Sequence, residues 1–112
     1  MIIYVAIPFS HPNEQIRNDR FEIANKYSAK LMMQGHIVFS PISHSFPISK
    51  HIGNPNDSEF YVKQDLHWLR HCDEMHVLML DGWKKSNGIG KETDFALGNN
   101  INIKYIESLT NS

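Results

Sequence analysis

Short apolar runs alternate with longer amphipathic segments along this chain. Residues 2–7 and 75–80 are mostly apolar, which is typical of strands that are buried on both faces of a sheet. Pro8 ends the first run, because proline has no N–H to donate to a sheet ladder. Residues 37–40 and 101–106 predict two further strands.

The segments between these strands have helical spacing. In residues 13–34 one face is apolar and the other is charged, and Gly35 supplies a C-terminal stop. A second helix is predicted from Asp57 or Ser58, either of which can cap it, to about residue 71. A third helix covers residues 88–97. The apolar face of the first helix consists of Ile16, Ile23, Ala24, Tyr27 and Leu31.

The order of these elements predicts the fold class. Because strands alternate with helices, we expect an α/β fold built on a doubly wound parallel sheet of about four to five strands, of the Rossmann or flavodoxin-like kind. A chain of 112 residues is long enough for one hydrophobic core and not for two. The sequence therefore predicts a single domain over residues 1–112.

One segment departs from this alternation. Residues 41–57 are rich in Pro, Ser, His, Asn and Gly and predict a loop that is unusually long for a compact domain. Since it follows the carboxyl end of a strand, it could fold over a ligand crevice as a lid. The alternative is a mobile surface loop without a function.

An acidic residue interrupts the apolar stripe of the second helix. Asp65 lies three residues after Val62 and four before Leu69, on the side that should face inward with Leu66 and Cys72. Burying a carboxylate without a partner is costly, so Asp65 either borders a polar cavity or has a dedicated partner. We favour the cavity.

Residues 86–92, with the sequence SNGIGKE, predict a turn between a buried strand and a helix. Such turns line the ligand crevice of open α/β sheets, and the free N–H groups of a helix start favour anions. The turn could hold a phosphate, with the Ser86 hydroxyl as a further donor, while Glu92 near the first helical turn would be kept ionised and able to act as a nucleophile. The alternative is an ordinary glycine-rich connection in which Glu92 only complements the helix dipole.

Composition narrows the class of ligand. The formal net charge is −1, with no basic excess, which disfavours a nucleic-acid polymer as partner.

The only cysteine, Cys72, excludes an intrachain disulfide and is best explained as a small buried thiol. His67 and His71 are one helical turn apart, but they flank the inward stripe, so a solvated face is favoured over a metal site. The first residues have neither a basic start nor an apolar run long enough for a leader or membrane span, so we expect a cytoplasmic protein.

Three segments, taken together, resemble the nucleoside 2-deoxyribosyltransferase superfamily, including its branch of 2'-deoxynucleoside 5'-monophosphate N-glycosidases. Residues 4–10 (YVAIPFS) are similar to the family's opening strand and loop. Residues 65–73 (DLHWLRHCD) are similar to its D-L-x-W-L-x-x-x-D helix end, and residues 86–92 to its S-x-G-x-G-x-E turn. The three matches occur in the family's order and span most of the chain.

The resemblance implies a role for each matching residue. Glu92 would be the nucleophile that attacks the anomeric carbon of a deoxyribosyl group, with Tyr4 as its neighbour. Asp65 would lie near the sugar or the leaving base and is the best candidate for the proton donor.

Ser86, within the motif that holds Gly88 and Gly90, would contact the 5'-phosphate. Pro8 stands where the monophosphate branch has a small phosphate-binding residue, so Ser10 would take that part, and Asp81, at a strand end, is a further candidate for ligand contact.

These observations predict an enzyme that cleaves or transfers the N-glycosidic bond of a 2'-deoxynucleoside or its 5'-monophosphate through a covalent deoxyribosyl-enzyme intermediate. We expect no metal and no organic cofactor, a small-molecule nucleoside or nucleotide as partner, no membrane, and a homo-oligomer. Two other functions stay open: a nucleotide-binding or sensing module without turnover, and a ribonucleotide phosphoribohydrolase.

Overall fold

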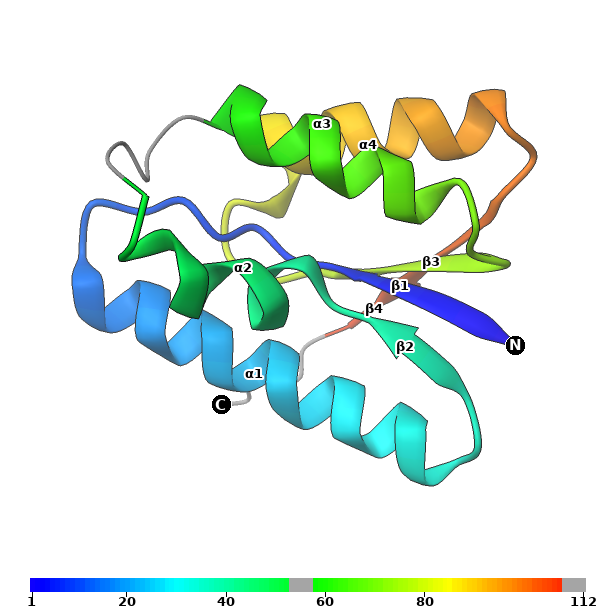
Figure 1. Ribbon diagram of the computed structural model, residues 1–112, viewed down its shortest axis with the longest axis horizontal. Coiled ribbons are helices and arrows are strands. Elements are labelled where there is room, and N and C mark those ends of the chain that lie inside the picture. The colour runs from blue at the N-terminus through cyan, green and yellow to red at the C-terminus, as the bar shows by residue number, and fades with distance from the viewer. Residues whose placement is uncertain (53–57, 108–112) are drawn as a thin grey trace.

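The computed structural model describes residues 1–52 and 58–107, with only the backbone of Ser58 (Figure 1). Strands and helices alternate along the chain as predicted, with one added helix and one short 3-10 turn. In chain order the elements are β1 (Ile2–Ala6), α1 (Glu14–Met33), β2 (Ile37–Phe39), α2 (Pro41–Ser49), α3 (Ser58–Leu69), β3 (Glu74–Leu78), η1 (Trp83–Lys85), α4 (Asn87–Gly98) and β4 (Asn102–Ile106).

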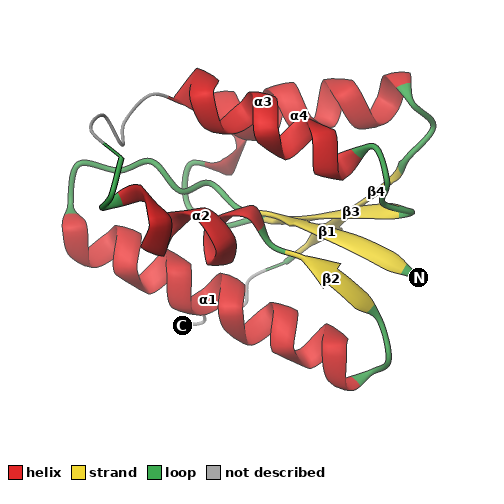
Figure 2. Ribbon diagram, in the orientation of Figure 1, coloured by secondary structure: helices red, strands yellow, loops and turns green. Residues whose placement is uncertain are grey.

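The four strands form one parallel sheet in the order β2-β1-β3-β4. Helix α1 covers one face, and α3 and α4 lie side by side on the other (Figure 2). This confirms the doubly wound α/β fold. The chain leaves β1 toward β2 on one side and later returns to β3 on the other, so the strand order reverses between β1 and β3. Ligands of open α/β sheets bind beside the carboxyl ends of the strands at such a point.

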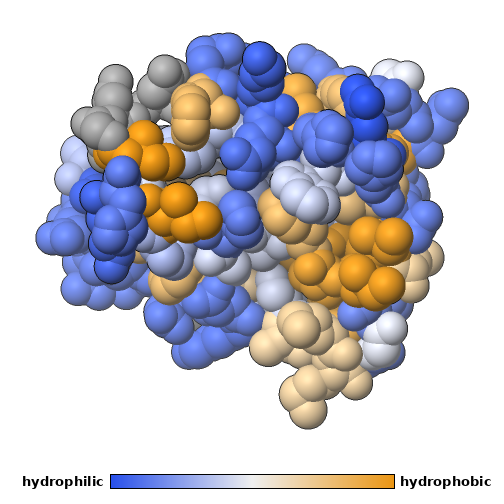
Figure 3. All heavy atoms as spheres, viewed as in Figure 1, coloured by the Kyte–Doolittle hydropathy of each residue, from blue (hydrophilic) through white to orange (hydrophobic). Residues whose placement is uncertain are grey.

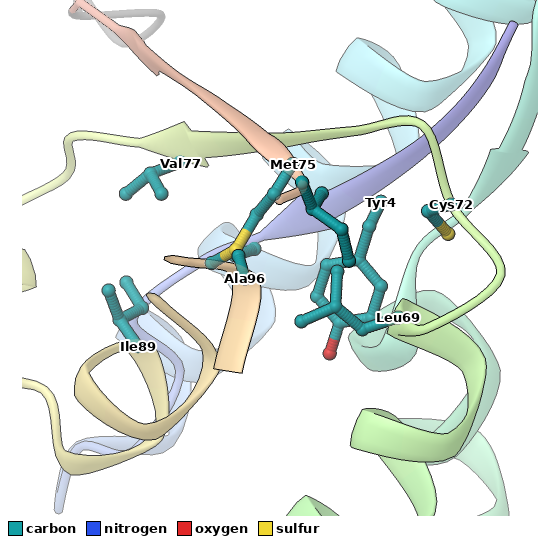
Figure 4. Packing of buried hydrophobic residues seen from close by; sticks show 9 residues of the cluster. Tyr4, Leu69, Cys72, Met75, Val77, Ile89 and Ala96 are labelled. Atoms are coloured by element: carbon teal, nitrogen blue, oxygen red, sulfur yellow. The ribbon is translucent and has the colours of Figure 1, made fainter. Parts of the chain in front are cut away.

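The two central strands bury side chains on both faces. In β1, Tyr4 and Ala6 point toward α3 and α4, whereas Ile3 and Val5 point toward α1. Figure 4 shows the first of these layers, where the ring of Tyr4 extends from β1 past Leu69 with its hydroxyl at the outer end. The alternation of side chains along a strand thus sends an ionisable hydroxyl into the interior of the α3/α4 layer.

The predicted ends of α1 are confirmed. The Asn13 side chain accepts a hydrogen bond from the Ile16 N–H at 3.1 Å, and Gly35 follows the helix with a φ of +95°, a value that favours glycine. The inward stripe of α3 is also confirmed, since Val62, Asp65, Leu69 and Cys72 are all buried and Leu66 partly so. The predicted cap at Asp57 lies outside the described residues.

The prediction of a loop over residues 41–57 is wrong in its first half, because Pro41–Ser49 form helix α2. The Ser40 hydroxyl caps this helix by accepting from the Ser43 N–H at 3.4 Å, and Pro41 occupies the first helical position, where a missing N–H costs nothing. Phe46 then packs its ring against Phe9 at 4.7 Å and Phe21 at 5.2 Å between ring centroids. Tertiary packing of one aromatic side chain therefore outweighs the loop-like composition. The remainder of the predicted loop is described only to residue 52.

The predicted turn over residues 86–92 lies earlier in the chain than expected. Ser86 is the N-cap of α4, with its hydroxyl accepting from the Ile89 N–H at 3.2 Å, and the helix begins at Asn87. Gly88 and Gly90 therefore lie inside the helix, and Glu92 is in its second turn. The turn that joins β3 to α4 consists instead of residues 79–86, including η1.

No helix in the part of the chain that the structure describes has both the length and the apolar character needed to cross a membrane. Apolar side chains gather on the surface over β2 and the end of α1 (Figure 3), where Met33 and Ile37 are 90% and 67% exposed. The structure holds one copy of the chain, so the homo-oligomer stays a prediction.

Candidate active site

A cavity of about 1750 Å³ opens at the carboxyl ends of the strands. Its wall is formed by the segment after β1, by α1 and α2, by α3, and by the segment from the end of β3 into α4. Asp65, Ser86, Gly88 and Glu92 line it together, although they come from different elements. The cavity therefore lies where the reversal of strand order predicts a ligand site.

Glu92 is the most deeply placed acid of the cavity. Its side chain is 6% exposed, and the Tyr4 hydroxyl donates a hydrogen bond to its Oε2. This hydrogen bond links the second turn of α4 to the middle of β1, across the interior of the α3/α4 layer. The structure therefore brings Tyr4 and Glu92 together.

Asp65 faces the same cavity from α3. It is 8% exposed, and its Oδ1 has no hydrogen-bond partner among the described residues. No cationic side chain among the described residues forms an ion pair with Asp65. Of the two explanations for an acid on the apolar stripe of α3, the polar cavity is therefore supported and the dedicated partner is not.

The expectation that Glu92 is held in its ionised form is wrong. Burial raises the pKa of Glu92 to about 8; the hydrogen bond from Tyr4 lowers this pKa and the nearby Asp65 raises it. The helix dipole acts within the first turn, and Glu92 lies beyond it. Burial likewise raises the pKa of Asp65 to about 7, and burial and Glu92 raise the pKa of Tyr4 well above its usual value.

The glycines of the motif do not form a cradle in this structure. A Cβ atom added to Gly88 would meet only the Ser86 hydroxyl, at 4.0 Å, and one added to Gly90 would meet nothing within 4 Å. Gly90 is not among the residues that line the cavity. Neither position therefore requires glycine for close packing within the protein, and the binding roles of both glycines stay predictions.

Ser10 and Asp81 both line the cavity, and Arg20 joins their backbone carbonyls. The Arg20 guanidinium donates to the Asp81 carbonyl at 2.8 Å and, with a longer contact of 3.5 Å, to the Ser10 carbonyl. It is buried from solvent, which lowers its pKa, while the Asp81 carboxylate raises it. Arg20 thus ties the segment after β1 to the segment after β3.

Arg20 was missed by the sequence reasoning, although a signal was present. It lies four residues after Ile16 and four before Ala24, so it interrupts the apolar face of α1 in the same way that Asp65 interrupts that of α3. A charged residue at an inward helical position indicates that it forms hydrogen bonds with other buried polar groups, because a buried charge without partners is costly.

We expect Arg20→Ala to lower the free energy of unfolding by about 2 kcal/mol, because two carbonyls lose a charged donor. Urea unfolding followed by circular dichroism measures this change. Arg70→Ala, at an exposed position directly after α3, is the control and should stay within about 0.5 kcal/mol of the unchanged protein. Equal stabilities of the two variants would contradict the bracing role of Arg20.

The cavity offers carboxyl and phenol groups rather than a set of metal ligands. Within residues 1–52 and 58–107, no three His, Cys, Asp or Glu side chains are close enough to hold a metal ion. Chemically, two buried acids and a phenol can supply a nucleophile, a proton donor and a hydrogen bond that stabilises negative charge.

The architecture is similar to that of a 2-deoxyribosyltransferase from the psychrotolerant bacterium Bacillus psychrosaccharolyticus, with a TM-score of 0.68 and 19% sequence identity. The alignment covers 99% of this chain and 77% of that chain. At this identity the likeness shows a shared fold. None of the curated protein sequences matches this chain. A protein-family profile described as "Domain of unknown function (DUF1937)" matches residues 1–107, and the chain therefore belongs to this family.

Proposed function

We propose that the protein cleaves or transfers the N-glycosidic bond of a 2'-deoxynucleoside or its 5'-monophosphate, with Glu92 as nucleophile. The observation that carries this proposal is that Glu92 and Asp65 line one cavity at the carboxyl ends of the strands, with the buried Tyr4 hydroxyl donating a hydrogen bond to Glu92. The fold shared with a 2-deoxyribosyltransferase supports the same class of reaction.

The proposed reaction has two steps. In the first, a Glu92 carboxylate oxygen bonds to C1' of the sugar, the C1'–N bond breaks, and its electron pair goes to the base, which takes a proton from Asp65. In the second, water or another base attacks C1', and the bond between C1' and the Glu92 oxygen breaks with its electron pair returning to Glu92. In either case Asp65 takes up the proton that the attacking water or base loses.

This reaction requires the two acids to hold one proton between them, on Asp65. Burial raises the pKa of Glu92 to about 8 and that of Asp65 to about 7, so the shared proton has to move from Glu92 to Asp65 when the substrate binds. The hydrogen bond from Tyr4 favours negative charge on Glu92, whereas Asp65 has no donor among the described residues. Mutual repulsion disfavours the state in which both are ionised. Tyr4 is therefore proposed to direct the charge to the nucleophile.

The substrate's 5' end is proposed to lie at the Ser86 side of the cavity. The Ser86 hydroxyl accepts from the Ile89 N–H, which leaves its own proton free to donate to a phosphate oxygen. Ser10 and Asp81 also line this cavity and remain candidate contacts. Lys85, beside Ser86 in the same wall, adds a positive charge.

The proposal is tested by incubating the protein with 2'-deoxynucleosides, their 5'-monophosphates and the matching ribonucleotides, with chromatography to detect free base. A fluorinated deoxyribosyl substrate, which slows the second step, should leave a covalent label that peptide mass spectrometry maps to Glu92. Release from ribonucleotides alone, or a label on another residue, would contradict the assignment.

One observation favours a second function, a nucleotide-binding or sensing module. Because burial raises the pKa of Glu92 to about 8, much of this group is protonated near neutral pH and a protonated carboxyl is a poor nucleophile. Tight binding of a deoxynucleotide without base release at any pH between 6 and 9 would support this module over the enzyme.

A further inference from the structure

Two buried polar atoms of the cavity have no partner in the described parts of the chain. They are Oδ1 of Asp65 and the hydroxyl of Tyr61, and both side chains line the cavity. An unsatisfied buried polar group costs about 1–3 kcal/mol, so two of them in one cavity indicate groups that a ligand completes. The reaction proposed above uses Asp65 and leaves Tyr61 without a role.

Tyr61 and Asp65 belong to the same face of α3. They are four residues apart, which places their Cβ atoms about 6 Å from each other, one turn apart along the helix. Helix α3 begins at the carboxyl end of the sheet and runs toward the other end (Figure 1), and Tyr61 lies one turn nearer the start of the helix than Asp65. A ligand group in contact with Asp65 can therefore extend past Tyr61.

We propose that Tyr61 is a specificity-determining residue whose hydroxyl hydrogen-bonds the exocyclic group of a purine base. This inference rests on the proposed function. Acid-assisted departure of a purine takes a proton at N7, and the exocyclic oxygen or amine at C6 lies beside N7. A carboxyl group and a phenol on one helix face match these two neighbouring groups, whereas a departing pyrimidine takes its proton at a single carbonyl oxygen. The phenol can donate to a 6-oxygen or accept from a 6-amine.

The test compares 2'-deoxyinosine and 2'-deoxyadenosine, each also as the 5'-monophosphate, with purine 2'-deoxyriboside, which has no group at C6. Tyr61→Phe removes the hydroxyl and keeps the ring. We expect kcat/KM to fall about tenfold for the substrates with a group at C6 and less than twofold for the analogue. Because the Tyr61 hydroxyl has no hydrogen-bond partner among the described residues, its removal should not lower the Tm of the variant.

The control is Tyr105→Phe, which removes a hydroxyl from an exposed tyrosine of β4 outside the cavity wall. It should leave all rates unchanged. An equal loss with all three bases, accompanied by a shift of the pH profile, would mean that Tyr61 supports the Asp65 carboxylate, and this would overturn the proposal. Release of pyrimidines but not purines would overturn it as well.

The inference can fail separately from the proposed function. If the unchanged protein releases no base, the glycosidase proposal fails, and the Kd values of the same compounds, measured by calorimetry, decide on Tyr61. A Kd that rises about tenfold in Tyr61→Phe only for compounds with a group at C6 supports the contact. Equal Kd values in both proteins, or no binding at all, would overturn it.

Discussion

Replacement of Glu92 with glutamine is expected to slow base release by roughly a thousandfold or more, because the amide cannot form the covalent intermediate. Glutamine has nearly the same shape and can still accept the hydrogen bond from Tyr4, so the cavity should keep its geometry. Initial rates of base release under saturating substrate measure the loss. Binding of the substrate should change much less than turnover.

Two controls make this result specific. Glu107→Gln, at an exposed position directly after β4 and outside the cavity wall, changes the same functional group without touching the pair of buried acids and should retain full activity. In Glu92→Ala, the space left by the side chain admits a small carboxylate, so added formate should restore part of the turnover. Turnover by Glu92→Gln within tenfold of the unchanged protein would exclude Glu92 as the nucleophile.

The fold could be predicted largely because its central strands are buried on both faces. Apolar runs such as residues 2–7 carry a strong signal, since a parallel sheet covered by helices leaves no polar face. Helix α2 could not be predicted in the same way, because its amino-acid composition resembles a loop and its stability comes from the contacts of Phe46 with Phe9 and Phe21. The signal that was present, a serine followed by proline at a helix start, is weak by itself.

The sequence predicted which residues form the candidate site better than it predicted their protonation states. The acid on the apolar stripe of α3 and the motif that ends at Glu92 both identified residues that share one cavity. The protonation of Glu92 could not be predicted. It depends on how deeply α4 is buried and on how close Glu92 lies to Asp65, and these two residues are 27 positions apart in the sequence. Arg20 and Tyr61 have roles set by unpaired or bridging atoms, which a one-dimensional pattern does not show.

The same burial that raises the two pKa values has a consequence for stability. A carboxyl whose pKa is higher in the folded than in the unfolded protein binds more protons when folded, so its contribution is fully present at low pH and is lost as pH rises through the folded pKa. For Glu92, with a pKa of about 8 against an ordinary value of 4.5, this window runs from about pH 4.5 to 8. Asp65 acts in the same direction up to about pH 7. Glu74 acts in the opposite direction, because the hydrogen bond from His76 lowers its pKa.

We therefore expect Glu92→Gln to be more stable than the unchanged protein at pH 8 while the two are similar at pH 5. The difference between a pKa of about 8 and the ordinary value of 4.5 corresponds to at most about 5 kcal/mol in unfolding free energy. Urea unfolding at pH 5, 6, 7 and 8 measures the two curves, with Glu107→Gln as the matched control. Parallel curves for Glu92→Gln and the unchanged protein would show that Glu92 titrates at its ordinary pKa. In that case the carboxylate would already be ionised at neutral pH without a bound substrate, and the charge-directing role of Tyr4 would be unnecessary.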